Sequence, residues 1–519
     1  MTRILKWFLV LFVFFIGAYM VATWKMKKEI VDFLNQKVPD HIAFSYEKLN
    51  INLFNGDLEF EKVEVESSGR QTSSCEILIN ADNLSISRFS YWKLLFEKSI
   101  YLKSLTLSKP HLNFKTCPKD PTEKEVTKPN PINLLKEIFI EELIFDSGIV
   151  EIWDSSEETE LLSVKSIDLN LKNVATDPQI IKKYVPFTFS EYGITIQNMT
   201  APLGKFEVLQ MKTMKLDNSS IHITNISLST ALSKLALSQE ITYQRDHIQL
   251  EIPEINIENH NYIVSNDSLQ VNFKSLILNA PNLEMYRDKS RLENFNRRPL
   301  YAELFRELPF KVAIDSILIK HGMVRYEEDL PNEESAGVLS FEKLDADISN
   351  FSNLASNKEN LKIKLNANLM GVGSFNLDWE FKVQDTRNTF LISGELSNFN
   401  TANLNDFLVP NLRTKTTGTI DQLYFTISGD GNIATGDIKM RYEDFKFQVL
   451  NKERNGVKKV LSFIGNLFVN DGSKADTEGY RYGNISTERT KNKSFFNYLW
   501  INLQDGLLDV LTGNGKKDE

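Results

Sequence analysis

The sequence predicts a mainly β protein with a few short helices, an N-terminal transmembrane helix and an internal duplication. Three observations support this fold class. Apolar residues alternate in short runs over most of the chain, which is the pattern of half-buried strands. An uncharged run, residues 7–24, precedes them. One stretch, IYLKSLTLSKPHLNF at residues 100–114, returns without a gap as VNFKSLILNAPNLEM at residues 271–285.

The repeating unit is a short strand with one extra residue in its middle, in the order apolar, x, apolar, x, x, apolar, x, apolar. Alternation places side chains on one face of a strand. The extra residue would reverse the faces unless a β-bulge or a kink absorbs it. We therefore predict bent strands that keep a single apolar face. The pattern fits Leu58–Val65, Ile100–Leu107, Ile138–Phe145, Ile221–Leu228, Val271–Leu278 and Val312–Ile319.

These six copies form three pairs in the same order along the chain, which indicates a duplicated unit. Gly148 corresponds to Gly322, and a short helix is expected before the later half of each copy, at Ile132–Ile138 and Leu300–Leu308. Residues 357–451 alternate almost throughout with closely spaced turns, as in an antiparallel meander. We predict an anchor at residues 1–28, a first repeat at 29–178, a second repeat at 179–356, the meander at 357–451 and a tail at 452–519.

The N-terminal run from Trp7 to Trp24 carries no charge. A helix of about 20 residues spans the hydrocarbon core of a bilayer, and tryptophan is favoured at its two interfaces. The rival interpretation is a cleaved signal peptide, which has a shorter apolar region and a cleavage site of small residues. Val21, Ala22 and Thr23 fit such a site poorly, and lysines follow directly. The sequence therefore favours an uncleaved single-pass anchor.

The tail contains a second amphipathic segment. Its apolar residues follow spacings of three and four, as on one face of a helix: Phe496, Leu499, Trp500, Leu503, Leu507, Val510 and Leu511. Two interpretations stay open. The helix packs on the end of the sheet, or it contacts a membrane or a partner.

Composition and motifs exclude several functions. A formal net charge of −9 argues against nucleic-acid binding, which favours a basic face. Cys75 and Cys117 could form a disulfide in an exported protein or remain two thiols. The six histidines show no metal-type spacing, and no nucleophile elbow or phosphate loop occurs. We expect no enzymatic activity, no cofactor and no metal site.

Several motifs are similar to those of the AsmA-like superfamily, which includes AsmA- and TamB-related envelope proteins. They are Leu53-Phe54-x-Gly56-x-Leu58, Lys103-Ser104-Leu105-x-Leu107-x-x-Pro110-x-Leu112 and Gly436-Asp437-Ile438-Lys439-Met440-x-Tyr442. The resemblance implies a long curled antiparallel β-sheet with an apolar groove. It also implies an inner-membrane anchor, with the bulk of the chain in the periplasm of a diderm bacterium.

The function implied by the resemblance is phospholipid transport between membranes or outer-membrane biogenesis, with an outer-membrane or envelope protein as an expected partner. An acyl chain needs an unbroken apolar track, because each CH₂ exposed to water costs about 0.8 kcal/mol. The expected groove-lining residues are Leu58, Phe60, Leu105, Leu107, Leu276, Leu278, Ile317 and Ile319. The alternative is a closed β-sandwich that acts as a membrane-tethered scaffold for envelope proteins, since a filled core gives the same alternation.

Overall fold

The computed structural model describes residues 15–28, 42–68, 76–97, 99–116, 137–156, 158–183, 185–265, 268–331, 335–450 and 475–512. The protein is mainly β, with a large mixed sheet and a few short helices, as the sequence predicts. The chain divides into two compact units. Unit 1 comprises Met1–Lys205 and Leu209–Ser219, and unit 2 comprises Phe206–Val208 and Ser220–Glu519.

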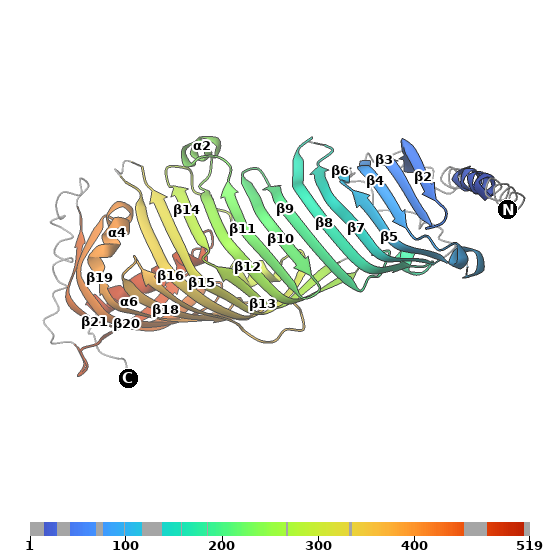
Figure 1. Cartoon of the computed structure of the whole chain (residues 1–519). Coiled ribbons are helices and arrows are strands. Elements are labelled where there is room, and N and C mark those ends of the chain that lie inside the picture. The colour runs from blue at the N-terminus through green and yellow to red at the C-terminus, as the bar shows by residue number, and fades with distance from the viewer. Residues whose placement is uncertain are drawn as a thin grey trace, which may run out of the picture. The chain divides into compact units, whose positions relative to one another are not determined.

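Unit 1 is built from strands that lie side by side (Figure 1). In order they are β1 (Ile42–Ser45), β2 (Lys48–Asn52), β3 (Asp57–Ser68), β4 (Glu76–Ser87), β5 (Ile100–Ser108), β6 (His111–Lys115), β7 (Ile138–Trp153), β8 (Glu160–Thr176) and β9 (Glu191–Leu203). Strand β10 (Glu207–Asp217) follows and pairs with β9. Two short helical turns are η1 (Lys93–Glu97) and η2 (Ile180–Lys182).

Unit 2 contains longer strands and most of the described helices. The strands are β11 (Ser220–Thr230), β12 (Asp246–Ser265), β13 (Ser268–Asn279), β14 (Asn282–Asp288), β15 (Lys311–Asp329), β16 (Gly337–Ser352), β17 (Leu361–Leu369), β18 (Gly373–Phe381), β19 (Phe390–Asn400), β20 (Thr414–Gly429), β21 (Ile433–Val449) and β22 (Arg481–Glu488). The helices are α2 (Lys234–Glu240), α3 (Tyr301–Arg306), η3 (Thr401–Leu404), α4 (Asn405–Leu412) and α6 (Phe495–Thr512).

Both units contain the same strand-pairing pattern. In unit 1, β4 pairs with β5 and β6, and both of these pair with β7. In unit 2, β12 pairs with β13 and β14, and both pair with β15. The pairings with β7 and β15 are parallel, so the expectation of a purely antiparallel sheet is wrong. Alternation gives the face of a residue but not the direction of the neighbouring strand.

A tight corner joins the two short strands of each pattern. In unit 1, Lys109 and Ser147 adopt left-handed conformations with φ of 49° and 56°, and the Ser147 amide donates to Asp168 at 2.9 Å. A Cβ on Gly148 would lie only 3.1 Å from the ring of Pro110, so the glycine allows this close approach. The corner therefore depends on a proline in the β5–β6 connection, a glycine in β7 and an aspartate in β8.

Unit 2 repeats this corner with different residues at the left-handed positions. Ala280 and His321 have φ of 49° and 56°, and the His321 amide donates to Asp345 at 2.8 Å. A Cβ on Gly322 would lie 3.3 Å from the ring of Pro281. The proline, the glycine and the aspartate are thus preserved between the two corners.

Kinks absorb the extra residue of the strand motif. Lys62 in β3 and Asn225 in β11 occupy that position with φ of 54° and 49°. The register of β3 against β4 is the same on both sides of Lys62. Phe60 and Val63, which flank the kink, belong to one apolar cluster. The strand therefore bends while its apolar side chains stay on one face.

The structure tests only some of the predictions made for the helices, the cysteines and the tail. Helix α3 lies within the stretch predicted at Leu300–Leu308. Of the helix predicted at Ile132–Ile138, residues 132–136 lie outside the described residues, and β7 begins at Ile138. Cys75, Cys117 and residues 452–474 of the tail also lie outside them.

The N-terminal segment is described from residue 15, and residues 15–28 are helical. Within the described part of the chain, no helix is both long enough and apolar enough to cross a membrane.

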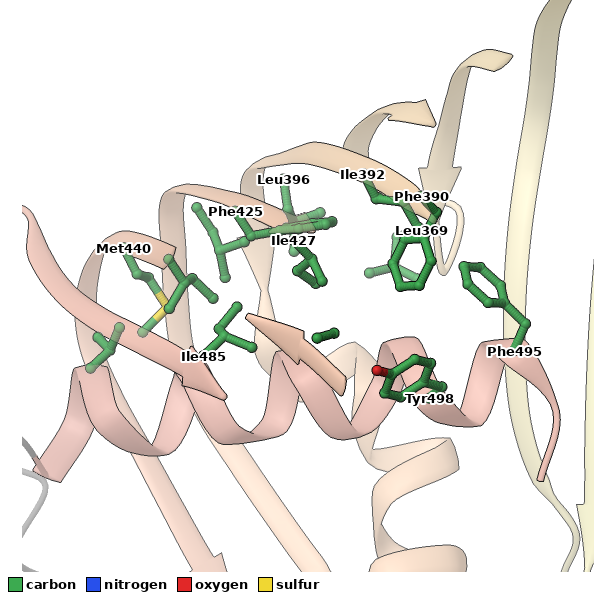
Figure 2. Close-up of a cluster of buried hydrophobic side chains, with 14 of the residues drawn as sticks. Leu369, Phe390, Ile392, Leu396, Phe425, Ile427, Met440, Ile485, Phe495 and Tyr498 are labelled. Atoms are coloured by element: carbon green, nitrogen blue, oxygen red, sulfur yellow. The ribbon is translucent and has the colours of Figure 1, made fainter. Parts of the chain in front are cut away.

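The main core of unit 2 lies between its last strands and helix α6. Figure 2 shows Phe390, Ile427 and Ile485 of the strands beside the helix, which contributes Phe495 and Tyr498. The side chains of Ile427, Ile485 and Tyr498 are at most 2% exposed. This end of the sheet is therefore a filled two-layer core, formed by sheet and helix.

Candidate functional site

Two rows of apolar residues run across the strands of unit 1. Each member is the direct cross-strand partner of the next, so all share one face of the sheet. The first row is Leu58, Ile86, Leu105, Leu143, Leu171 and Tyr192, and the second is Phe60, Leu84, Leu107, Phe145, Leu169 and Ile194. Between them, Ser85, Thr106 and Asn170 face the other side. We call the side that carries the rows the apolar face.

Unit 2 carries two longer rows of the same kind. The first is Ile221, Ile257, Leu276, Ile317, Ile348, Ile363, Trp379, Ile392 and Ile427. The second is Ile223, Ile255, Leu278, Ile319, Ala346, Leu365 and Leu377, followed by Gly394 and Phe425. On the opposite face, the set Ser275, Ser316 and Ser349 is polar, whereas Ile277 and Leu318 place apolar side chains there between the two rows.

All eight residues that the sequence singles out lie on these rows. Leu58 and Leu105 are in the first row of unit 1, and Phe60 and Leu107 are in the second. In unit 2, Leu276 pairs directly with Ile317, and Leu278 pairs with Ile319. The structure brings each set of four together within its own unit. Their contact with lipid stays a prediction.

The exposure of the rows changes along unit 2. In unit 1, every row member except Phe60 and Leu171 stays partly exposed. In unit 2, the row members on β13, β17 and β18 are also partly exposed. From β19 onward the rows are sealed, since Ile392 and Ile427 are 0% exposed. In unit 2 the accessible surface is therefore interrupted: both row residues of β12, Ile255 and Ile257, are only 8% exposed, and the large side chains of the rows are sealed from β19 onward.

Helix α6 seals this end through an unusually close approach to β22. A Cβ on Gly483 would lie 2.6 Å from the carbonyl oxygen of Gly506, and one on Gly506 would lie 2.7 Å from side-chain carbons of Ile438 and Ile485. Both positions require glycine at this separation. The helix therefore meets the strand backbone to backbone.

Two carboxylates of α6 also protect the outer edge of β22. Asp509 accepts a hydrogen bond from the Asn484 amide at 2.7 Å, and Asp505 accepts one from the Ser486 amide at 2.9 Å. Unpaired amides on an edge strand invite pairing with another chain. These aspartates occupy the edge instead.

The face of α6 that packs on the sheet differs from the predicted stripe. Tyr498, Asn502 and Gly506 are buried in the contact, although only the first is a large apolar residue. Of the predicted residues, Val510 and Leu511 are buried, and Leu499, Leu503 and Leu507 pack partly against the core. Trp500 is partly exposed, and Phe496 is 60% exposed. Sequence reasoning missed Asn502 and Gly506 because a hydrophobic pattern does not count them.

A row of charged residues borders the apolar face in unit 2. Arg287 donates two hydrogen bonds to Asp246 at 2.7 and 2.6 Å, and its partner on β15 is Glu328. Glu328 also accepts from the hydroxyl of Tyr326 at 2.6 Å and lies 2.9 Å from Lys289. Burial raises the pKa of Tyr326, so it stays a neutral donor. The border is therefore polar and fully paired.

One hollow in unit 1 is polar. It is lined by residues that include Lys62, Asp82, Lys109 and His111. Asp82 lies between the two lysines, at 3.8 and 3.4 Å from their Nζ atoms. Among the described residues, no group of three or more His, Cys, Asp or Glu side chains could hold a metal ion. The charges in this hollow are therefore paired.

Comparison with known proteins adds no assignment. No model of a known protein family matches the chain, and no curated protein matches it either. The apolar face is thus the feature from which a function is argued.

Proposed function

We propose that this protein holds the acyl chains of phospholipids on its apolar face and serves lipid transport between membranes or outer-membrane biogenesis. It would be anchored in the inner membrane of a diderm bacterium by its N-terminal segment, with the strands in the periplasm. We further propose that the two strand patterns arose by duplication and that the apolar face of each unit forms a groove. The shared corners at Pro110 and Pro281 support the duplication.

The observation that carries the proposal is the partial exposure of the apolar rows. Row residues such as Leu105, Leu143 and Leu276 remain accessible to solvent although their neighbours are also apolar. Soluble proteins rarely expose contiguous apolar surface unless it binds something. The sealed end at α6 shows how this chain covers the same face when it builds a core.

The dimensions suit an acyl chain. Neighbouring strands lie about 4.8 Å apart. Each row in unit 1 crosses six strands and therefore extends over about 24 Å. One leaflet of a bilayer core is about 15 Å deep, half of about 30 Å. Each CH₂ moved from water onto such a surface gains about 0.8 kcal/mol when it is fully buried. The charged border at Arg287 and Glu328 gives the face a polar margin, as an amphipathic ligand requires.

Site-specific photo-crosslinking tests the proposal in the full chain. A benzophenone analogue of phenylalanine replaces Leu105 or Leu276, one position in each unit. Matched controls carry it at Ser104 or Ser275, the adjacent residues that face the opposite side. The protein is expressed in a diderm bacterium grown with radioactive phosphate, irradiated in the cells and purified under denaturing conditions.

We expect radiolabelled phospholipid on the protein from the Leu105 and Leu276 positions and much less from the two serine positions. Equal labelling of both faces, or none, would contradict lipid binding by the apolar face. A crosslink from Leu105 or Leu276 to a protein instead would favour the scaffold for envelope proteins.

A further inference from the structure

Three exposed aromatic side chains gather at one end of unit 1. Phe54 is 84% exposed, Trp92 is 67% exposed and Phe96 is 65% exposed. Phe54 lies in the turn between β2 and β3, and the other two lie in the connection between β4 and β5. The rings of Trp92 and Phe96 contact each other at a tilt of 36°, with centroids 4.1 Å apart. We call these three residues the aromatic tip.

The two connections that carry the tip are fixed to each other. The amide of Phe89 donates to the carbonyl of Gly56 at 2.8 Å, and the amide of Arg88 donates to Asp57 at 3.1 Å. Gly56 has φ of 72°, and a Cβ there would lie 2.6 Å from the carbonyl oxygen of Phe89. Backbone hydrogen bonds between the two connections therefore fix the position of the tip.

The tip continues into the apolar face on one side. Phe89 packs in the cluster that contains Ile86 and Leu105 of the first row. Leu58, the first member of that row, follows Phe54 closely in the same hairpin. A chain that leaves the tip therefore meets the apolar row directly.

On its other side the tip contacts the N-terminal helix. The ring of Tyr19 stacks on Phe54 with centroids 4.8 Å apart, and Lys27 donates to the carbonyl of Leu49 at 3.1 Å. The helix exposes further apolar side chains, among them Met20 and Trp24, each 66% exposed. Exposed apolar side chains thus lie on both the helix and the tip, which meet where Tyr19 stacks on Phe54.

We propose that the aromatic tip inserts into the interface of the phospholipid bilayer and delivers acyl chains to the first row of unit 1. This inference rests on the proposed function and names the membrane contact of the same face. Tryptophan and phenylalanine combine apolar area with a preference for the headgroup boundary. Lys93, whose Nζ lies 4.0 Å from the ring centroid of Tyr101, places a cation behind the tip toward the phosphates.

Quenching by brominated lipids tests the insertion. The full chain is reconstituted into vesicles of phosphatidylethanolamine and phosphatidylglycerol whose acyl chains carry bromine. The emission of Trp92 is obtained as the difference between the native chain and Trp92→Phe, which keeps a ring beside Phe96. The control is the same difference for Trp153→Phe, since Trp153 ends β7 at the opposite end of the strands and faces away from the rows.

We expect the Trp92 emission to shift to shorter wavelength and to be quenched, more strongly by bromine near the headgroup end of the chain than near the methyl end. The Trp153 emission should not change. Phe54→Trp, made in the Trp92→Phe background, should behave like Trp92.

Emission from Trp92 that brominated lipid leaves unchanged would overturn the insertion, as would equal quenching of Trp153. Crosslinking of phospholipid at Leu105 in the same chain separates the two proposals. If lipid still crosslinks there while Trp92 is not quenched, the face carries lipid and the tip is not its entry point. If Trp92 is quenched without a crosslink, the tip binds membrane and the transport proposal fails.

Discussion

The contact between Gly483 and Gly506 predicts how much stability is lost when each glycine is replaced by alanine. In Gly506→Ala the new Cβ lies 2.7 Å from side-chain carbons of Ile438 and Ile485, where ordinary contacts are about 3.5–4.0 Å. Overpacking of this kind costs about 1–3 kcal/mol. Alanine recovers about 1 kcal/mol of helix propensity. Because the side chains of Ile438 and Ile485 can adjust, we expect Gly506→Ala to destabilise the packing of α6 by a net of about 1 kcal/mol.

Gly483→Ala should destabilise the contact more than Gly506→Ala, because its new Cβ would clash with the backbone of α6. The nearest atoms are the Gly506 carbonyl oxygen at 2.6 Å and the Val510 nitrogen at 2.7 Å, so the helix must move as a body. We place this overpacking at the upper end of about 1–3 kcal/mol and the gain from removing a strand glycine at about 0.5–1 kcal/mol. The net loss is then about 2 kcal/mol.

Hydrogen exchange of the α6 and β22 amides measures both effects, because it reports local opening where whole-chain unfolding has no single midpoint. We expect protection to fall about 30-fold for Gly483→Ala and about 5-fold for Gly506→Ala, since 1.4 kcal/mol is a factor of ten. The control is Gly193→Ala, where a Cβ meets nothing within 4 Å. Equal protection in Gly483→Ala and in this control would refute the reasoning.

Further predictions concern the same unit. Asn502→Leu should slow exchange in α6, because the buried Asn502 Oδ1 has no hydrogen-bond partner within the described part of the chain and such a group costs about 1–3 kcal/mol. The pair Asp505→Ala and Asp509→Ala should promote self-association in light scattering by freeing the edge of β22, whereas monodisperse protein would argue against edge protection. The hydrogen bond from Arg297 lowers the pKa of Glu303, so this carboxylate stabilises the fold above its unfolded pKa of about 4.3 and less as pH falls through its lower folded value. Hydrogen exchange of the α3 amides should therefore separate the native chain from Glu303→Gln at pH 7 and bring the two together in acid.

The sequence pattern was sufficient to identify the apolar face. Leu105 and Ser104 alternate as strand neighbours must, so their opposite faces follow from period two alone. The extra residue was expected to need a bulge or a kink, and Lys62 and Asn225 supply kinks. What the pattern could not give was direction, because β5 has the same alternation whether it runs with or against β7.

The hydrophobic pattern could not predict which face of α6 packs on the sheet, and the reason is physical. The closest contact is at Gly506, which allows it because glycine has no side chain. Asn502 is buried in the same contact, but every hydrophobicity scale counts asparagine as polar. The aromatic tip had a visible signal in the stretch from Tyr91 to Phe96, but exposure depends on the corner around Gly56 and Phe89. Such a corner depends on backbone hydrogen bonds between segments far apart in the sequence.

The corner shared by the two units has a consequence for tracing the ancestry of this chain. Its left-handed residues differ, with serine in one unit and histidine in the other, whereas a proline in the connection and a glycine and an aspartate on two strands recur. Selection at such a corner acts on a few positions separated by long stretches in which any apolar residue suffices. Divergence can therefore erase contiguous identity while leaving this spaced triplet intact. Distant homologues should be recognisable by the triplet when aligned similarity has disappeared.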